Sequence, residues 1–198
     1  MIIAITGYIG SGKTTLARFI QKQGFKYISA DSIGHELLKK EPIKKRLLKE
    51  FGKEILSNNR ICRRKLGRLV FTDTKKLKKF NKIIHPLLEK EIKTRINKEK
   101  QAKNNVVIDV ALFKELKLQK ITDQVILIKS NKSLIYKRKT KYTKQQLTNI
   151  IKNQNITNKY DFCILNNTTK QDLIRKTRKI LNRIRKWKQQ STREHLIQ

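Results

Sequence analysis

Residues 7–14 read Gly-Tyr-Ile-Gly-Ser-Gly-Lys-Thr, a full match to the pattern G-x-x-x-x-G-K-S/T. The apolar run 2–5 predicts a buried strand directly before this motif, and residues 15–20 suit a helix directly after it. Glycines let the backbone curl until successive N–H groups face one point, and a helix starting near Lys13 adds the positive end of its dipole there. The sequence therefore predicts a phosphate-binding loop between a strand and a helix.

The residue types in this loop indicate a nucleoside triphosphate with Mg²⁺. The ammonium of Lys13 would neutralise charge on the β- and γ-phosphates, and the hydroxyl of Thr14 would coordinate the metal. Mg²⁺ bridges the phosphates and takes up charge that develops during transfer. We therefore expect Lys13 to be catalytic and Thr14 to be a metal ligand.

Length and composition bound the class of protein. A chain of 198 residues suits one α/β domain with inserted segments. Its two cysteines, Cys62 and Cys163, are too few and too isolated for a disulfide framework or a metal cluster. No run reaches the roughly 20 apolar residues of a membrane span, so we expect no membrane partner. The first strand leads straight into the phosphate loop, so we expect no cleaved signal peptide and a cytoplasmic location.

The charge is strongly positive, with 49 Lys and Arg against 15 Asp and Glu, a formal net charge of +34. Dense positive charge binds nucleic-acid backbones, but such a function needs a localised surface. The basic residues are instead spread over nearly every expected helix, together with many Ile and Asn. We interpret this as compositional bias on solvated helix faces and expect no specific nucleic-acid partner.

The order of patterns predicts a three-layer α/β/α fold with a parallel sheet, of the P-loop NTPase class. Residues 32–103 are helical and highly charged, with no convincing strand, which favours an inserted substrate-binding region. Residues 131–154 form a basic helical segment in which Thr143 and Gln146 match a capping box, and we expect a small lid there. Further strands are expected over 105–110, 124–128 and 160–166, before a last helix with Leu173, Ile180, Leu181, Ile184 and Trp187 on one side. The predicted core is about 1–31, 104–130 and 155–187.

Asp31 follows the second expected strand, residues 25–29, and is the one early acid near the expected site. Ligands of doubly wound sheets bind outside the carboxyl ends of the strands, so Asp31 and the phosphate loop can face one crevice. A carboxylate there could hold an alcohol in line with the γ-phosphorus. The alternative is that Asp31 caps a helix, and the two roles are compatible.

Seven segments spread over roughly residues 1 to 185 form a combined pattern: Thr6 to Thr14, Ala30-Asp31, Phe51-Gly52, Val70-Phe71, Ile84-His85-Pro86, Asp109 to Glu115 and Asp161 to Asn166. The phosphate loop alone would fit many enzymes, whereas the Asp after the second strand combined with the Phe-Gly, Val-Phe and His-Pro pairs is far more selective. In order and spacing, these segments resemble dephospho-CoA kinases. The resemblance implies transfer of the γ-phosphoryl group of ATP to the ribose 3′-hydroxyl of dephospho-CoA.

The resemblance also implies a set of site residues. It assigns Asp31 to the accepting hydroxyl as base or orienting group, Arg63 to the border of the substrate site and His85 to the substrate pocket. Asp109 is expected to bind the substrate; alternatively, it orients Mg²⁺ through water or caps the next segment. Asn166 is expected near the adenine. The residues assigned to the ATP phosphates are Gly10, Ser11, Gly12, Lys13, Thr14 and Thr15.

Three positions depart from the family pattern. Cys62 stands where Asp is usual, Ala111 where Pro is usual, and Lys139 where the lid usually has Arg. An ammonium cannot fork two phosphate oxygens as a guanidinium can, and Arg138 is adjacent, so either Arg138 or Lys139 is expected to be the lid cation.

The sequence leaves two other functions open. A nucleoside or nucleoside-monophosphate kinase would share the loop and lid but not the Phe-Gly, Val-Phe and His-Pro series. A basic nucleic-acid-binding protein with a relic phosphate loop would bind in a salt-dependent manner and ignore ATP. The oligomeric state is open, with a monomer favoured.

Overall fold

The computed structural model of the chain describes residues 1–138 and 142–194. Its centre is a five-stranded parallel sheet in the order β2-β5-β1-β6-β7. The strands are β1 (Ile2–Gly7), β2 (Lys26–Ser29), β5 (Val106–Asp109), β6 (Gln124–Lys129) and β7 (Phe162–Leu165). The fold is therefore of the α/β class, as the alternation of apolar runs and helical segments predicted.

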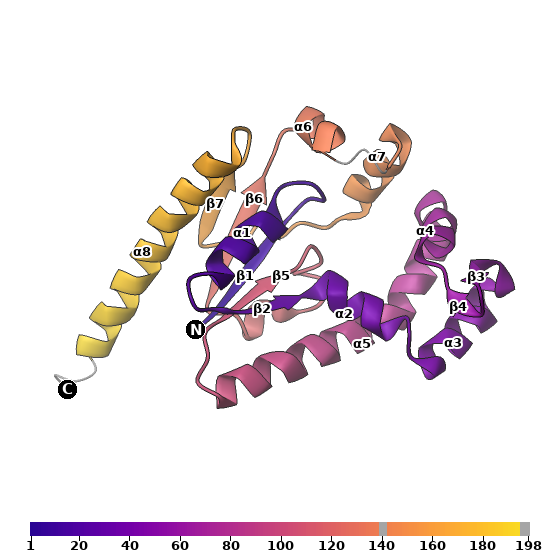
Figure 1. The fold of residues 1–198 in the computed structure, drawn as a ribbon, viewed down its shortest axis with the longest axis horizontal. Coiled ribbons are helices and arrows are strands. Elements are labelled where there is room, and N and C mark those ends of the chain that lie inside the picture. The colour runs from indigo at the N-terminus through magenta and orange to yellow at the C-terminus, as the bar shows by residue number, and fades with distance from the viewer. Residues whose placement is uncertain (139–141, 195–198) are drawn as a thin grey trace.

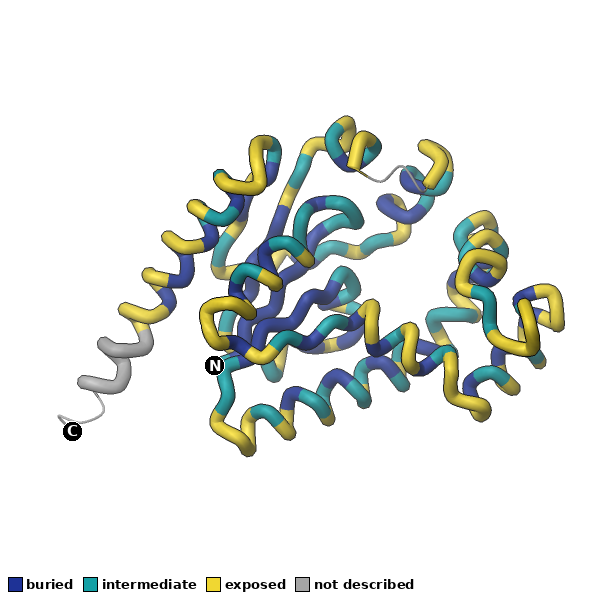
Figure 2. Tube along the Cα trace, in the orientation of Figure 1, coloured by how far each residue is buried: buried dark blue, intermediate teal, exposed yellow. Residues whose placement is uncertain are grey.

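Helices cover both faces of this sheet (Figure 1). On one face, α1 (Lys13–Gln21) and α8 (Lys170–Glu194) pack against alternate strand residues such as Ile3, Ile5 and Ile126. On the other face, α5 (Thr74–Gln101) packs with its neighbours against Ala4 and Ile108, which lie one residue out of phase. Figure 2 shows the buried residues concentrated in the strands, as expected for a parallel sheet covered on both sides.

Between β2 and β5 lie the helices α2 (Ala30–Leu37), α3 (Glu41–Phe51), α4 (Arg63–Thr72) and α5. A 3₁₀ turn, η1 (Lys53–Ile55), follows α3, and a small antiparallel pair follows the turn: β3 (Leu56–Ser57) and β4 (Arg60–Ile61). The expectation that no strand interrupts this region was therefore wrong. Two-residue strands are too short for a periodic signal. The turn signal was Asn58-Asn59, whose φ angles of 46° and 56° suit a tight hairpin.

The segment after β6 contains α6 (Lys132–Arg138) and α7 (Lys144–Asn153). The predicted capping box is confirmed: Thr143 Oγ1 accepts from the backbone N–H of Gln146, and the Gln146 side chain accepts from the N–H of Thr143. Helix α7 buries Leu147 and packs against α4 of the inserted helices. Helix α7 is thus linked to the insertion through α4, and α6 is joined to α7 by the hydrogen bond between the Tyr136 and Thr148 hydroxyls.

Three smaller features complete the fold. A second 3₁₀ turn, η2 (Leu118–Lys120), precedes β6. Trp187 is 58% exposed, so it does not share the buried face of α8 with Leu181 and Ile184. Cys62 is partly exposed and Cys163 exposed, and no helix among the described residues is long and apolar enough to cross a membrane.

Candidate active site

The phosphate loop, residues 7–14, joins the end of β1 to the start of α1 and requires glycine at two positions. Gly7 has φ of +145°, and a Cβ there would lie 2.2 Å from the Ile128 carbonyl oxygen on β6. Gly12 has φ of +108°, and its Cβ would lie 2.4 Å from Nδ2 of Asn166. Both the left-handed backbone and the close neighbours exclude a larger residue.

Lys13 is the first residue of α1, and its side chain folds back along the loop. Its Nζ donates to the carbonyl oxygens of Gly7 and Tyr8, at 3.0 Å each. The backbone N–H of Ser11 also donates to the Tyr8 oxygen, at 3.1 Å. The ammonium is therefore held against the first two residues of the phosphate loop.

Asp109 ends β5, the strand beside β1, and faces the start of α1. Thr14 Oγ1 donates to Asp109 Oδ2 at 2.7 Å, and the Tyr27 hydroxyl approaches the same oxygen at 3.3 Å. Burial raises the pKa of Asp109, and the charge of Asp31 raises that pKa further, against the lowering effects of the Thr14 hydrogen bond and of Lys13. A hydroxyl and a carboxylate side by side are the oxygen ligands that Mg²⁺ prefers, so these residues fit the metal.

Asp31 lies in the first turn of α2 and is exposed. The helix cap is Ser29, whose Oγ accepts from the N–H of Ser32 at 3.2 Å, so the alternative reading of Asp31 as a cap was wrong. Its carboxylate is close enough to influence the pKa of both Asp109 and His35. Ile5 and Ser29 both pair with Asp109 in the sheet register, so positions 13, 31 and 109 lie together at the carboxyl end of the sheet.

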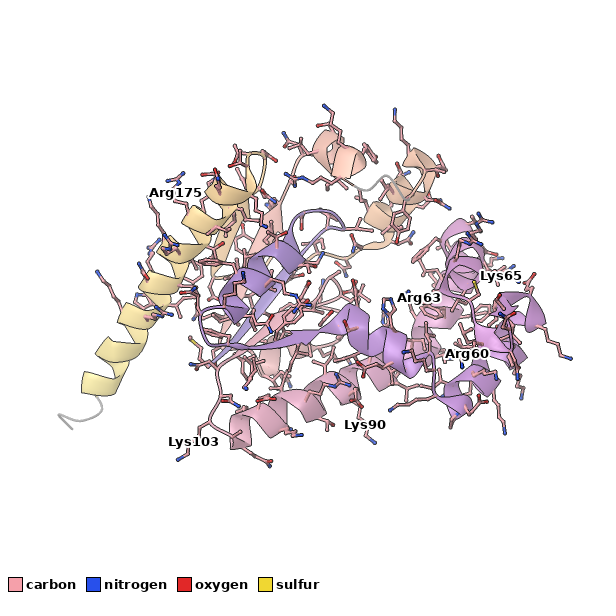
Figure 3. The ribbon with its side chains drawn as sticks, viewed as in Figure 1. Arg60, Arg63, Lys65, Lys90, Lys103 and Arg175 are labelled. Carbon is pink, nitrogen blue, oxygen red and sulfur yellow. The ribbon has the colours of Figure 1, made fainter. Side chains whose placement is uncertain are left out.

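Arg63 begins α4 and reaches back toward α2 (Figure 3). Its Nη1 lies 2.8 Å from Nδ1 and 2.7 Å from Nε2 of His35, and it can donate to one of them at a time. Burial and then the charge of Arg63 lower the pKa of His35. His35 was not predicted as a site residue; its spacing of four from Asp31 on a helix was the available signal.

His85 precedes Pro86 inside α5. Its Nε2 is buried and has no hydrogen-bond partner among the described residues, and burial lowers the pKa of its imidazole. His85 therefore favours the neutral form, in which a ring nitrogen can accept or donate one hydrogen bond.

Asn166 and Arg138 contact the middle of the phosphate loop, at the carbonyl oxygens of Ser11 and Gly10. The buried side chain of Asn166 donates from Nδ2 to the Ser11 carbonyl oxygen at 2.7 Å. Arg138, at the end of α6, donates to the Asn166 carbonyl oxygen and to Ser130 Oγ at 3.1 Å each, and approaches the Gly10 oxygen at 3.5 Å. Lys139, the other candidate lid cation, lies outside the described residues.

Thr15 is partly buried within α1. Two residues that contact this region were missed by sequence reasoning: Ser130, next to Arg138, and Gln154, whose side chain accepts a hydrogen bond from the loop residue Ile9. Neither belongs to a recognisable motif, and each is brought to the loop by the path of the chain.

The family of dephospho-CoA kinases matches residues 1–172, which include every residue of the candidate site described in the preceding paragraphs. The chain belongs to the dephospho-CoA kinase family. Members of this family are ATP-dependent kinases, so the fold class and the enzyme class predicted from the sequence are confirmed.

Individual dephospho-CoA kinases support the same assignment. The chain is 32% identical over 195 residues to the dephospho-CoA kinase of Fusobacterium nucleatum, covering 93% of this chain and 98% of that one. It is 39% identical over 139 residues to that of Dehalococcoides mccartyi, covering 69% and 70%. The solved dephospho-CoA kinase of Campylobacter jejuni superposes with a TM-score of 0.69 at 25% identity, covering 94% and 98%.

Proposed function

We propose that this chain transfers the γ-phosphoryl group of ATP to the ribose 3′-hydroxyl of dephospho-CoA, giving CoA and ADP, as its family membership implies. The observation that carries the proposal is the placement of Lys13, Asp31 and Asp109 at or just after the ends of the neighbouring strands β1, β2 and β5, at the carboxyl end of one parallel sheet. Phosphoryl transfer depends on positioning and charge neutralisation, and these residues supply one ammonium and two carboxylates there.

On the nucleotide side, we assign the backbone and side chains of residues 10–15 to the phosphates of ATP. The Lys13 ammonium carries three N–H donors, so it would keep its contact with the Tyr8 carbonyl oxygen while it meets the β- and γ-phosphates. Asn166 would hold the loop in place through its hydrogen bond to the Ser11 carbonyl oxygen. Of the two candidate lid cations, we assign Arg138, which approaches the Gly10 carbonyl oxygen.

Mg²⁺ would be held by Thr14, with Asp109 as its carboxylate neighbour. When bound, the metal neutralises negative charge on the transferring phosphoryl group. This assignment moves Asp109 from the predicted substrate site toward the metal, because its Oδ2 already meets the Thr14 hydroxyl at 2.7 Å.

On the acceptor side, we assign Asp31 to the hydroxyl that is phosphorylated. It would accept the hydroxyl proton and hold the oxygen in line with the γ-phosphorus. Arg63, held by His35, offers a cation for an anionic group of the acceptor, and His85 offers a neutral nitrogen. We also assign residues 32–103 to acceptor binding and residues 131–154 to a lid. A monomeric, cytoplasmic protein stays a prediction.

The test is an ADP-release assay with Mg·ATP that compares dephospho-CoA with adenosine, AMP and CMP and confirms CoA by mass. We expect turnover of dephospho-CoA alone. Asp31→Asn should keep ATP affinity within about twofold and lose at least about 100-fold in kcat, because the amide cannot accept the hydroxyl proton. Asp161→Asn is a matched control at an exposed acid that caps the N–H of Val125 away from the loop. Turnover of CMP or AMP in place of dephospho-CoA would reject the proposed substrate, and near-normal kcat in Asp31→Asn would reject its role.

A further inference from the structure

Gln154 follows helix α7, at the end of the lid segment, residues 131–154, and touches the phosphate loop. Its Oε1 accepts a hydrogen bond from the backbone N–H of Ile9 at 3.0 Å, and the side chain is half-buried. The two residues are separated by 145 positions in the chain. We propose that Gln154 is a positioning residue that orients the Tyr8–Ile9 peptide and, through it, the ammonium of Lys13.

The argument starts from the peptide unit itself. The N–H of Ile9 and the carbonyl of Tyr8 belong to one planar group, in which the two bonds point in opposite directions. On the carbonyl side, the Tyr8 oxygen accepts from Lys13 Nζ at 3.0 Å and from the N–H of Ser11 at 3.1 Å. On the N–H side, the partner is Gln154. Rotation of this plane would therefore break contacts on both sides, and Gln154 fixes the direction in which the oxygen meets Lys13.

Gln154 is itself held in place from two directions. The next residue, Asn155, donates its backbone N–H to Glu115 Oε1 at 3.2 Å, which ties the segment to the loop after β5. One turn earlier, Asn149 Nδ2 approaches the carbonyl oxygen of Phe71 on α4 at 3.5 Å. The backbone around Gln154 is therefore anchored to the loop after β5 through Asn155 and to α4 through Asn149.

This arrangement couples three parts of the site. With α7 against α4 and Asn155 bonded to Glu115, Gln154 holds the Tyr8–Ile9 peptide, and the peptide holds the ammonium of Lys13. Without the Gln154 amide oxygen, the peptide loses its N–H partner and the position of the ammonium is less restricted. The inference rests on the proposed role of Lys13 at the β- and γ-phosphates, and it assigns Gln154 no contact with the reacting atoms.

The test uses Gln154→Met, which keeps the side-chain length and removes the acceptor oxygen, and Gln154→Ala as a smaller second variant. Gln145→Met, at an exposed position of α7, is the matched control. Affinities for ATP, ADP and AMP are measured by competition with a fluorescent ATP analogue in the presence of Mg²⁺. We expect ATP and ADP to bind about tenfold more weakly to both Gln154 variants, because one oriented hydrogen bond is lost. AMP, which lacks the phosphates that meet Lys13, should bind within about twofold of the wild-type value.

Kinetics give a second readout that a merely structural role would not reproduce. The value of kcat/KM for ATP should fall about tenfold while KM for dephospho-CoA stays unchanged. An equal loss of affinity for all three nucleotides, no loss, or a failure of both variants to fold cooperatively would each overturn the proposal. The nucleotide titration needs no acceptor, so it decides the role of Gln154 even if the wild type does not phosphorylate dephospho-CoA.

Discussion

Replacing Asp109 by Asn should stabilise the nucleotide-free protein while it removes most of the activity. Asp109 is 8% exposed, and its Oδ2 meets Thr14 at 2.7 Å and Tyr27 at 3.3 Å. Burying a carboxylate costs several kcal/mol, of which hydrogen bonds to a charged group recover about 1.5–3 kcal/mol each. Asparagine keeps an acceptor oxygen for both hydroxyls without the charge, so we expect a net gain on the order of 1 kcal/mol. For a chain of this size that corresponds to a rise in Tm of about 2–4 °C.

The pH dependence of this effect has a definite sign. Because burial raises the pKa of Asp109 above its value in the unfolded chain, the folded state binds more protons than the unfolded state between those two pKa values. The wild type should therefore lose stability as pH rises through that window, and Asp109→Asn should lack this loss. The advantage of the variant should be absent near pH 3 to 4, around the ordinary pKa of Asp, and present at pH 7.

The assay is thermal unfolding at several pH values, with and without Mg·ATP, together with steady-state ADP release. Turnover should fall at least about 100-fold, since the variant lacks the carboxylate beside Thr14, the residue proposed to hold the metal. Mg·ATP should also raise the Tm of the variant by less than it raises that of the wild type. A variant that is less stable than the wild type at pH 7 without ligand would refute the reasoning about burial, and wild-type turnover would refute the assignment to the metal.

Two further substitutions test the other side of the loop. Gly12→Ala should weaken ATP binding at least about tenfold in an isothermal titration, because the new Cβ would lie 2.4 Å from Asn166 Nδ2 and displace this amide from the Ser11 oxygen. Gly24→Ala is the control: Gly24 has φ of +92° and no atom within 4 Å of the added Cβ, so this variant has the backbone strain without the clash and should bind ATP normally. Arg138→Lys should lower kcat about tenfold in a steady-state assay, because the guanidinium of Arg138 contacts three oxygen atoms in a forked geometry that an ammonium cannot match. The Tm should change little, since the side chain is exposed. An unchanged kcat would exclude Arg138 as the lid cation.

Much of the fold followed from local patterns. Apolar runs marked the five parallel strands, of which the central three, β5, β1 and β6, are largely buried. The phosphate loop fixed the junction of β1 and α1, because its glycines and its Lys-Thr pair admit few backbone paths. The capping box at Thr143 marked the start of α7. Patterns of this kind span only a few residues, so they can be recognised in the sequence without knowledge of the fold. The hairpin β3–β4 was missed because strands of two residues carry no period.

The sequence by itself determined which chemical groups the candidate site contains: a glycine-rich loop with its lysine and threonine, and an acid placed after the second strand. Which side chains hold those groups was decided only by the tertiary structure. Thr14 meets Asp109 because β5 lies beside β1, and Arg63 meets His35 because α4 returns to α2. Gln154 reaches Ile9 because the chain comes back to the phosphate loop after α7. These contacts depend on strand order and helix packing, and neither is encoded in the spacing of the residues that make them.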